Sequence, residues 1–313
     1  MSPETGKPKY IIVLGTTYSG SGAVYDYLAG RGDLCDPLAG EEYQLPQVPN
    51  GLMALEAAAG QAFHPAAADH ALIQFEDVVQ RLARPRTRWR YGKDYARKIP
   101  GFRDVVGQFI DEVSTARIRM RLDWHRLMQS PAQTVLSHIK ERFGLNQQPS
   151  TTRVLSTRSA LVAASRSMHD EMFQPESKGI PVLLNQAGSG WNPVESTKYF
   201  NDRKVVLVVR DPRDQFAELK KFKKASDVVE FIKWYRALQK RIAVVEEGVV
   251  LKFSFEEFVA NNSVFVESVC VHCGLDTTVS SPYQAILSEK NIGKYQRWLT
   301  PYEIEVIEDA LIR

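Results

Sequence analysis

Two kinds of hydrophobic pattern alternate along the chain. Short continuous runs of apolar residues occur at Tyr10–Leu14 and Lys204–Val209, and such runs are typical of strands buried in a parallel sheet. Elsewhere apolar residues recur at spacings of three and four, which favours helices with one buried face. These helical stretches are Ala66–Ala83, Asp104–Met128, Ala132–Phe143 and Arg158–Phe173. The pattern therefore predicts an α/β protein that contains a parallel sheet.

A loop rich in glycine and serine follows the first apolar run, and helical spacing resumes at Val24. In a strand–loop–helix unit of this kind, glycines let the backbone approach an anion closely. The helix start adds unpaired N–H groups and about half a positive charge. An ordinary glycine- and serine-rich turn is the alternative interpretation. The candidates for phosphate binding are Thr17, Tyr18, Ser19, Gly20, Ser21, Gly22 and Ala23.

This loop lacks the residues of two common nucleotide-binding motifs. A nucleoside-triphosphate P-loop needs Gly-Lys-Ser/Thr, so that the lysine meets the terminal phosphates and the hydroxyl holds Mg²⁺, but no lysine lies between Tyr10 and Gly40. A dinucleotide fingerprint needs a third small residue where Tyr25 stands. A P-loop-type kinase or NTPase therefore remains only as an alternative.

Two later segments also carry phosphate-binding chemistry. The second apolar run leads directly into Arg210-Asp211-Pro212-Arg213-Asp214, and an arginine fixed at the end of a strand can grip a phosphate with two N–H groups. Near the end of the chain, Asn291-Ile292-Gly293-Lys294-Tyr295 combines small, basic and aromatic residues. A helix is predicted to start soon afterwards, at Pro301 and Glu303.

Together these segments resemble the sulfotransferases that use 3′-phosphoadenosine 5′-phosphosulfate (PAPS), and they occur in the family's order. The strand and helix signal of Val250–Phe258 looks like the family's Tyr-Glu-Asp-Leu run. The resemblance implies a P-loop NTPase-like sulfotransferase fold, with a central parallel sheet and flanking helices. It implies that the first loop holds the 5′-phosphosulfate, that Arg210 holds the 3′-phosphate, and that no metal is needed. The residues implied to close the pocket are Asn291, Ile292, Gly293 and Lys294.

Two positions depart from the family's pattern. Tyr18 stands where the family has Lys or Arg against the 5′-phosphosulfate, so Lys294, Arg213 or the basic middle segment would have to supply that cation. Glu218 stands where the family has a serine that contacts the 3′-phosphate. Its charge would repel a phosphate unless the side chain points away. The lysines that could replace the serine are Lys220, Lys221 and Lys223.

A general base must take the proton of an acceptor hydroxyl. The segment Gly40-Glu41-Glu42-Tyr43-Gln44 resembles the Glu-x-His/Gln-Phe segment of glycan-modifying sulfotransferases, in which the glutamate is the base. The resemblance assigns this role to Glu42, with Glu41 as its neighbour, and implies a carbohydrate or glycoconjugate acceptor. A histidine is the alternative base. The histidines are His64, His70, His125, His138, His169 and His272.

The middle of the chain, residues about 52–178, is expected to be a mostly helical insertion over the site, within a single domain of residues 1–313. It contains a basic segment, Arg81–Arg103, in which Trp89, Tyr91 and Tyr95 are interleaved with arginines and lysines. Such a segment suits an acidic glycan, a phosphate-linked or lipid-linked acceptor, or nucleic acid. A solvated loop is the alternative.

Composition narrows these choices. At 313 residues, with 44% hydrophobic and 25% charged residues, the chain can bury a large core. The net charge of +3 is too small to indicate a nucleic-acid-binding protein. No apolar run approaches the roughly 20 residues of a membrane span, and the expected compartment is the cytoplasm.

Three cysteines do not form a disulfide framework, and Cys270 and Cys273 are expected to be buried. A non-catalytic anion- or glycan-binding module is the third functional possibility.

Overall fold

The computed structural model describes residues 9–60, 63–119, 130–144, 151–177, 179–243 and 248–312. Two units make up the chain. The first unit comprises Met1–Val48, Ala96–Pro100 and His169–Arg313, and the second comprises Pro49–Tyr95 and Gly101–Met168. The organisation as a single domain with an insertion stays a prediction.

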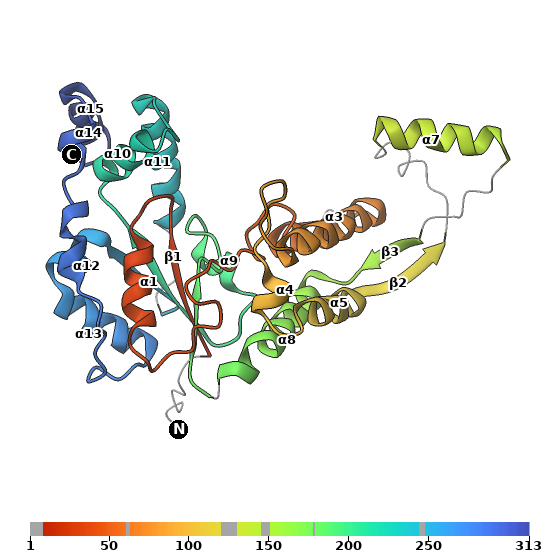
Figure 1. Ribbon diagram of the computed structural model, residues 1–313, viewed down its shortest axis with the longest axis horizontal. Helices are drawn as coiled ribbons and strands as arrows, with labels where there is room; N and C mark the ends of the chain where they lie inside the picture. Colours follow the sequence, from red (N-terminus) through yellow and green to blue (C-terminus); the bar gives the residue numbers. More distant parts are fainter. Residues whose placement is uncertain are drawn as a thin grey trace. The chain divides into compact units, whose positions relative to one another are not determined.

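The first unit is built on a parallel sheet (Figure 1). Every neighbouring pair of strands is parallel, in the order β4-β1-β5-β6. The central parallel sheet that the apolar runs predict is therefore confirmed. Because the strands share one direction, their carboxyl ends lie along one edge of the sheet. The strands are β1 (Tyr10–Gly15), β4 (Val182–Asn185), β5 (Arg203–Val209) and β6 (Val250–Ser254).

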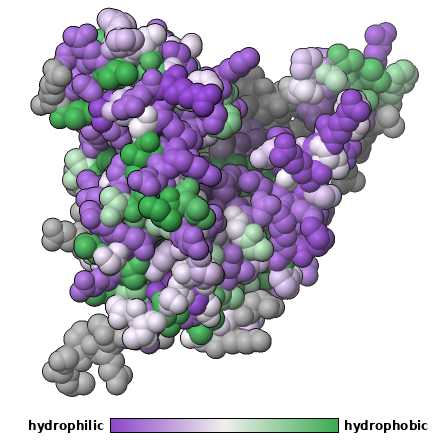
Figure 2. All heavy atoms as spheres, turned by 60° about the vertical axis from the view of Figure 1, so that its left-hand side comes forward, coloured by the Kyte–Doolittle hydropathy of each residue, from purple (hydrophilic) through white to green (hydrophobic). Residues whose placement is uncertain are grey.

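Both faces of β1 are buried. Ile11 and Val13 pack into a cluster formed with α1 (Ser21–Ala29), α12 (Phe255–Ala260) and α13 (Asn262–Cys273). On the alternate face, the ring of Tyr10 lies 5.2 Å from that of Phe200. Burial on both sides explains why this strand is a continuous apolar run, and each such side chain contributes about 1.5–3 kcal/mol. The surface drawn in Figure 2 is mainly hydrophilic, with hydrophobic side chains in small groups.

Helices of the C-terminal part complete the first unit, and the start of the last helix follows a sequence signal. Thr300 caps the last helix and shares a capping box with Glu303, as the residues after Leu299 predict. Cys270 and Cys273 are buried as expected, and burial raises the pKa of Cys273 to about 12. These helices are α9 (Pro193–Thr197), α10 (Pro212–Lys221), α11 (Val228–Ile242), the 3₁₀ helix η1 (Ala285–Asn291), α14 (Tyr295–Trp298) and α15 (Pro301–Leu311).

The second unit is mainly helical. The helices predicted from Ala66, Ala132 and Arg158 onward are confirmed as α3, α7 and α8. None of the helices that the structure describes is both long and apolar enough to cross a membrane. The helices of this part are α2 (Leu52–Ala58), α3 (Pro65–Ala83), α4 (Tyr95–Lys98), α5 (Phe102–Val113), α7 (Pro131–Arg142) and α8 (Arg158–Ser177); α4 and α8 continue into the first unit.

One helix prediction is wrong over part of its length. The stretch Asp104–Met128 forms a helix only as far as Val113, where α5 ends. The strand β2 (Ser114–Arg119) follows and pairs antiparallel with β3 (Thr151–Leu155). Thr115 and Ile118 are β-branched and favour a strand, but the partner strand lies far along the chain, where local spacing gives no sign of it. Residues 120–128 of this prediction lie outside the described residues.

Candidate functional site

The predicted site segments begin at the same edge of the sheet. The first loop follows β1, and Arg210 follows β5, the strand paired with β1. The strand β4 pairs with β1 on its other side and leads into Gln186. Ligands of open parallel sheets bind outside the carboxyl ends of strands, at the point where strand order changes direction. This edge is therefore where a ligand is expected.

The first loop holds a conformation that requires glycine at one position. Gly20 has a φ of +84°, and a Cβ atom added there would lie 2.4 Å from the ring of Phe255. Tyr18 also has a positive φ, +58°, and its ring stacks on that of Phe222 with the ring centres 5.2 Å apart. At Gly22, by contrast, an added Cβ would meet no atom within 4 Å. Of these two positions, only Gly20 must be glycine for steric reasons.

The loop presents donors where α1 begins. The helix has Gly20 at its N-cap, with no side-chain cap. Within the described residues, the N–H groups of Ser21 and Gly22 have no acceptor, and the buried hydroxyl of Ser19 has no hydrogen-bond partner. Ala23 is different, because its N–H donates to the carbonyl of Gly20. Unpaired donors at a helix N-terminus form an anion-binding site.

Glutamine side chains fix this loop in place. Gln186 donates from Nε2 to the hydroxyl of Ser21 at 2.9 Å and accepts from the N–H of Gly15 at 3.3 Å. Gln47 donates to the carbonyl of Gln186 at 2.7 Å, which positions that residue in turn. Sequence reasoning missed both glutamines. The signal for Gln186 was present, because it opens a serine- and glycine-rich stretch directly after the apolar run of β4.

Arg210 connects the first and third segments. Its guanidinium donates from Nη1 to the carbonyl of Tyr18 at 3.0 Å and from Nη2 to the carbonyl of Asn291. The side chain is 6% exposed, and its Nε atom has no partner within the described residues. The guanidinium also lies over the ring of Phe255, at 5.2 Å from the ring centre. Arg210 therefore sits where two predicted donor-binding segments meet.

Asp214 makes a second connection to the third segment. Its carboxylate accepts from the N–H of Gly293 at 2.7 Å and from the N–H of Tyr295 at 2.9 Å. Burial raises the pKa of Asp214, although these two hydrogen bonds act in the opposite direction. The residues Asn291, Ile292, Gly293 and Lys294 are thus held next to the strand end that carries Arg210, as the order of the motifs suggests.

Two of the cations proposed for the first loop, Lys294 and Arg213, have carboxylate partners. Lys294 lies 2.6 Å from Glu218. Arg213 lies 2.6 Å from both Asp211 and Glu308. The basic middle segment belongs largely to the second unit. None of these residues lines the pocket that opens at this edge of the sheet.

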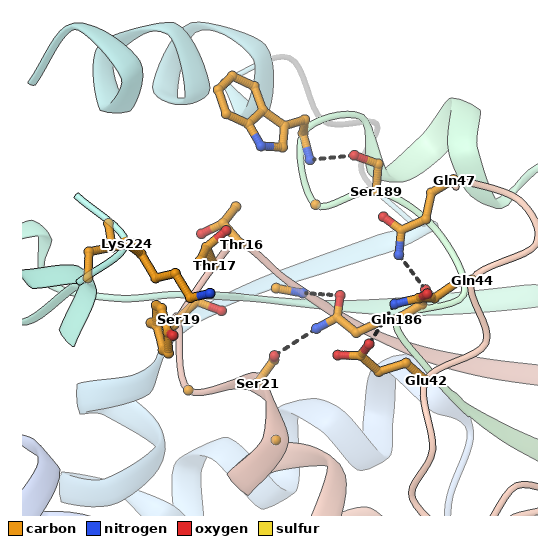
Figure 3. A pocket seen from close by; sticks show the side chains of 17 residues that line it. Thr16, Thr17, Ser19, Ser21, Glu42, Gln44, Gln47, Gln186, Ser189 and Lys224 are labelled. Atoms are coloured by element: carbon orange, nitrogen blue, oxygen red, sulfur yellow. Dashed lines mark hydrogen bonds between the residues drawn. The ribbon is translucent and has the colours of Figure 1, made fainter. Parts of the chain in front are cut away.

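A pocket of about 800 Å³ opens at this edge of the first unit (Figure 3). It contains most of the predicted first-loop residues together with Glu42. Arg210 and the third segment adjoin the loop without lining this pocket. The lining residues are Gly15, Thr16, Thr17, Tyr18, Ser19, Gly20, Ser21, Gly22, Glu42, Gln44, Gln47, Gln186, Ser189, Gly190, Trp191, Leu219 and Lys224.

The two candidate glutamates lie in different surroundings, and only one of them lines the pocket. Glu42 lines the pocket, and its Oε2 atom accepts from Nε2 of Gln44 at 2.7 Å. Glu41 does not line the pocket and lies 3.0 Å from the ammonium of Lys98. No histidine is among the lining residues. His169, for example, is fully buried between the carbonyl of Tyr199 and the hydroxyl of Tyr43, so it has a packing role. His125 lies outside the described residues.

Lys224 brings a positive charge to the pocket that sequence reasoning missed. It follows α10, and in Figure 3 its ammonium extends toward the loop beside Ser19, whereas Glu42 lies on the other side of the view. Within the described part of the chain, this ammonium has no carboxylate partner. The run Lys220–Lys224 gave a signal for a cation here, but not for which lysine reaches the pocket.

Solved structures similar to this chain are sulfotransferases. A sulfotransferase domain from the Synechococcus PCC 7002 olefin synthase is 12% identical, with a TM-score of 0.43, and the match covers 99% of this chain and 97% of that one. A sulfotransferase domain from the curacin biosynthetic pathway is 11% identical, with a TM-score of 0.42 and coverage of 97% and 98%. Sulfotransferase STF1 from Mycobacterium tuberculosis H37Rv is 12% identical, with a TM-score of 0.36 and coverage of 93% and 77%. No protein-family model matches the sequence, and no curated protein does. At these identities the assignment of an activity depends on the chain's own residues.

Proposed function

We propose that this protein is a sulfotransferase that moves the sulfuryl group of PAPS to a hydroxyl of a carbohydrate or glycoconjugate acceptor. The observation that carries the proposal is the position of Arg210, whose guanidinium bonds the carbonyls of both Tyr18 and Asn291. Three segments whose sequences resemble donor-binding motifs therefore meet at one edge of the sheet. Each motif is weak evidence alone, and their meeting at one place supports reading them as parts of a single site.

The 5′-phosphosulfate is assigned to the start of α1. There the N–H groups of Ser21 and Gly22 and the hydroxyl of Ser19 offer donors. Lys224 is assigned the charge that the family's loop lysine or arginine supplies, because its ammonium projects into the same pocket. Three hydrogen-bond donors and one full positive charge match an anion that carries less charge than a triphosphate.

The 3′-phosphate is assigned to Arg210. Its Nε–H is buried and has no protein acceptor within the described residues, so the guanidinium retains bonding capacity. The carbonyls that it now bonds hold the guanidinium in a fixed orientation at the strand end. A preorganised arginine of this kind gives a phosphate both charge and direction.

Transfer itself is assigned to Glu42 and to the donors of the first loop. The acceptor oxygen forms a bond to sulfur while the bond from sulfur to the 5′-phosphate oxygen breaks, and Glu42 takes the acceptor's proton. The leaving 3′-phosphoadenosine 5′-phosphate (PAP) carries the charge of the broken bond, and the donors between Ser19 and Gly22 stabilise that charge. Glu42 lines the pocket together with this loop, as the proposal requires.

A carbohydrate acceptor agrees with the polar character of the pocket wall beside Glu42. Gln44 and Gln47 offer amide groups that can donate to and accept from sugar hydroxyls, and Trp191 offers an aromatic face. These residues line the same pocket as Glu42, so a bound sugar would lie within reach of the proposed base.

Titration calorimetry with PAP, ATP and NAD tests the proposal. The proposed site should bind PAP in preference to ATP and NAD, and Arg210→Ala should remove that preference. Lys224→Met should weaken PAP binding about tenfold or more, whereas Lys223→Met, the matched change at the preceding exposed residue, should have little effect. Preference for ATP would favour a kinase or NTPase instead, and equal loss with both lysine variants would contradict the role of Lys224.

A further inference from the structure

The second unit carries a hydrogen-bonded hairpin loop, Arg84–Asp94, whose tip lies at Arg88 and Trp89. The N–H of Asp94 donates to the carbonyl of Arg84 at 2.7 Å, which closes the base of the hairpin. At the tip, the N–H of Thr87 donates to the carbonyl of Arg90 at 2.8 Å. At Gly92 an added Cβ would lie 2.1 Å from the carbonyl oxygen of Arg84, so this close approach requires glycine. Backbone hydrogen bonds and this close approach therefore define the conformation of the hairpin.

Four arginines of this hairpin have no carboxylate partner within the described residues. Other basic residues of the same segment are engaged, since Arg81 pairs with Asp77 at 2.6 Å and Lys98 pairs with Glu41 at 3.0 Å. The unpaired charges are thus concentrated on alternate residues of a short projection. An isolated surface charge is ordinary, but four of one sign create a local positive field. These residues are Arg84, Arg86, Arg88 and Arg90, all of them exposed.

Two aromatic side chains are exposed among these arginines. Trp89 is 84% exposed and Tyr91 is 66% exposed. The guanidinium of Arg88 lies 5.3 Å from the ring centre of Trp89, and that of Arg86 lies 5.3 Å from the ring centre of Tyr91. Two of the arginine guanidinium groups therefore lie next to an exposed aromatic ring. Leaving a tryptophan in water forfeits the free energy of burying it, so its exposure at a hairpin tip indicates a partner.

We propose that the hairpin Arg84–Asp94 docks on the anionic surface of a lipid bilayer. Arginines bind lipid phosphates and carboxylates, while Trp89 and Tyr91 enter the interfacial layer, where rings with one apolar and one polar side reside. The shape favours this partner over nucleic acid. A projecting two-residue tip fits an extended surface, whereas bases and sugars are held in grooves by contacts on more than one side. If the proposed transfer activity holds, such docking would place the protein at the surface where a membrane-borne glycoconjugate acceptor resides.

Co-sedimentation of the full chain with vesicles tests this proposal. We expect binding to vesicles of equimolar phosphatidylcholine and phosphatidylserine, little binding to phosphatidylcholine alone, and loss of binding as salt is raised. Removing two surface charges with Arg86→Gln/Arg88→Gln should lower the partition coefficient about 30-fold. The matched control is Lys240→Gln/Arg241→Gln, which removes the same charge from two exposed residues at the end of α11 and should change binding little.

Tryptophan fluorescence separates docking from general attraction of a basic protein. Insertion should shift the emission of the chain to shorter wavelength on anionic vesicles, and Trp89→Phe should remove most of that shift. All variants change exposed side chains and should melt at the wild-type temperature. Equal vesicle binding by the arginine and control variants would overturn the proposal. So would arginine-dependent binding to a single-stranded oligonucleotide that vesicles do not compete away.

Discussion

Nζ of Lys294 lies 2.6 Å from Oε1 of Glu218, and this ion pair joins the C-terminal segment to α10. The carboxylate is 7% exposed and the lysine side chain 24%. Lys221 lies farther from the same carboxylate, at 3.9 Å. The negative charge of Glu218 is thus compensated locally, which removes the repulsion that this residue would otherwise exert on a bound phosphate.

Removing one partner of this pair should destabilise the fold. Lys294→Met leaves a buried carboxylate with only a distant lysine, and we expect a loss of about 1–3 kcal/mol, less than for a fully buried pair because the lysine is partly solvated. The double variant Lys294→Met/Glu218→Gln should lose less than the sum of the two single variants. Chemical denaturation of the four proteins measures the coupling, and additive losses would mean that the pair does not form in solution.

Substitutions in the first loop should separate Gly20 from Gly22. Gly20→Ala places a Cβ against the ring of Phe255 and forces a positive φ on a residue that resists it, so we expect a loss of several kcal/mol of stability. Gly22→Ala meets no atom within 4 Å and replaces a flexible residue in the first turn of α1. That variant should melt at or above the wild-type temperature. Similar melting temperatures for both variants would contradict the loop conformation.

The strands β1 and β5 of the first unit could be predicted from local pattern. A strand buried on both faces must be apolar at every position, so β1 and β5 are recognisable without any knowledge of their neighbours. The strand β2 could not be found in this way, because its register depends on β3, beyond residues 120–150 of the chain. The arginines and the other exposed residues of β2 give a polar pattern that resembles the solvent-facing side of a helix.

The site could be predicted only where residues adjoin such strands. The first loop and Arg210 follow strands directly, so the chain order itself places them at one edge of the sheet. Lys224 and Gln47 reach the pocket from loops whose paths depend on tertiary packing. The ion pairs of Lys294 and Arg213 likewise depend on contacts between distant segments, which explains why sequence reasoning offered both residues as cations for the first loop.

Acid should weaken the first unit through Asp170. Burial alone would raise the pKa of this carboxyl, but hydrogen bonds from Asn201, Lys9 and Tyr10 outweigh burial and lower it. A lowered folded-state pKa means that the stabilisation is complete above the unfolded value of about 3.9 and is lost as the pH falls through the folded value. Asp170→Asn should therefore cost about 1–3 kcal/mol at neutral pH, as for other hydrogen bonds to charged groups. Urea denaturation across pH checks this, and a cost that stays constant below about pH 4 would contradict it.

Glu42 and Glu41 should differ in their effect on turnover. Glu42→Gln keeps the size of the side chain and removes its basicity, so we expect kcat for sulfuryl transfer to fall by about 10²–10⁴-fold. The affinity for PAP should hardly change, because the donor is assigned to the first loop and Arg210. Glu41→Gln is the matched control, since Glu41 pairs with Lys98 and does not line the pocket. Release of PAP in the presence of an acceptor found by a donor-consumption screen measures kcat. A greater loss with Glu41→Gln would mean that Glu41, and not Glu42, is the base. Full activity of both variants would contradict a glutamate base.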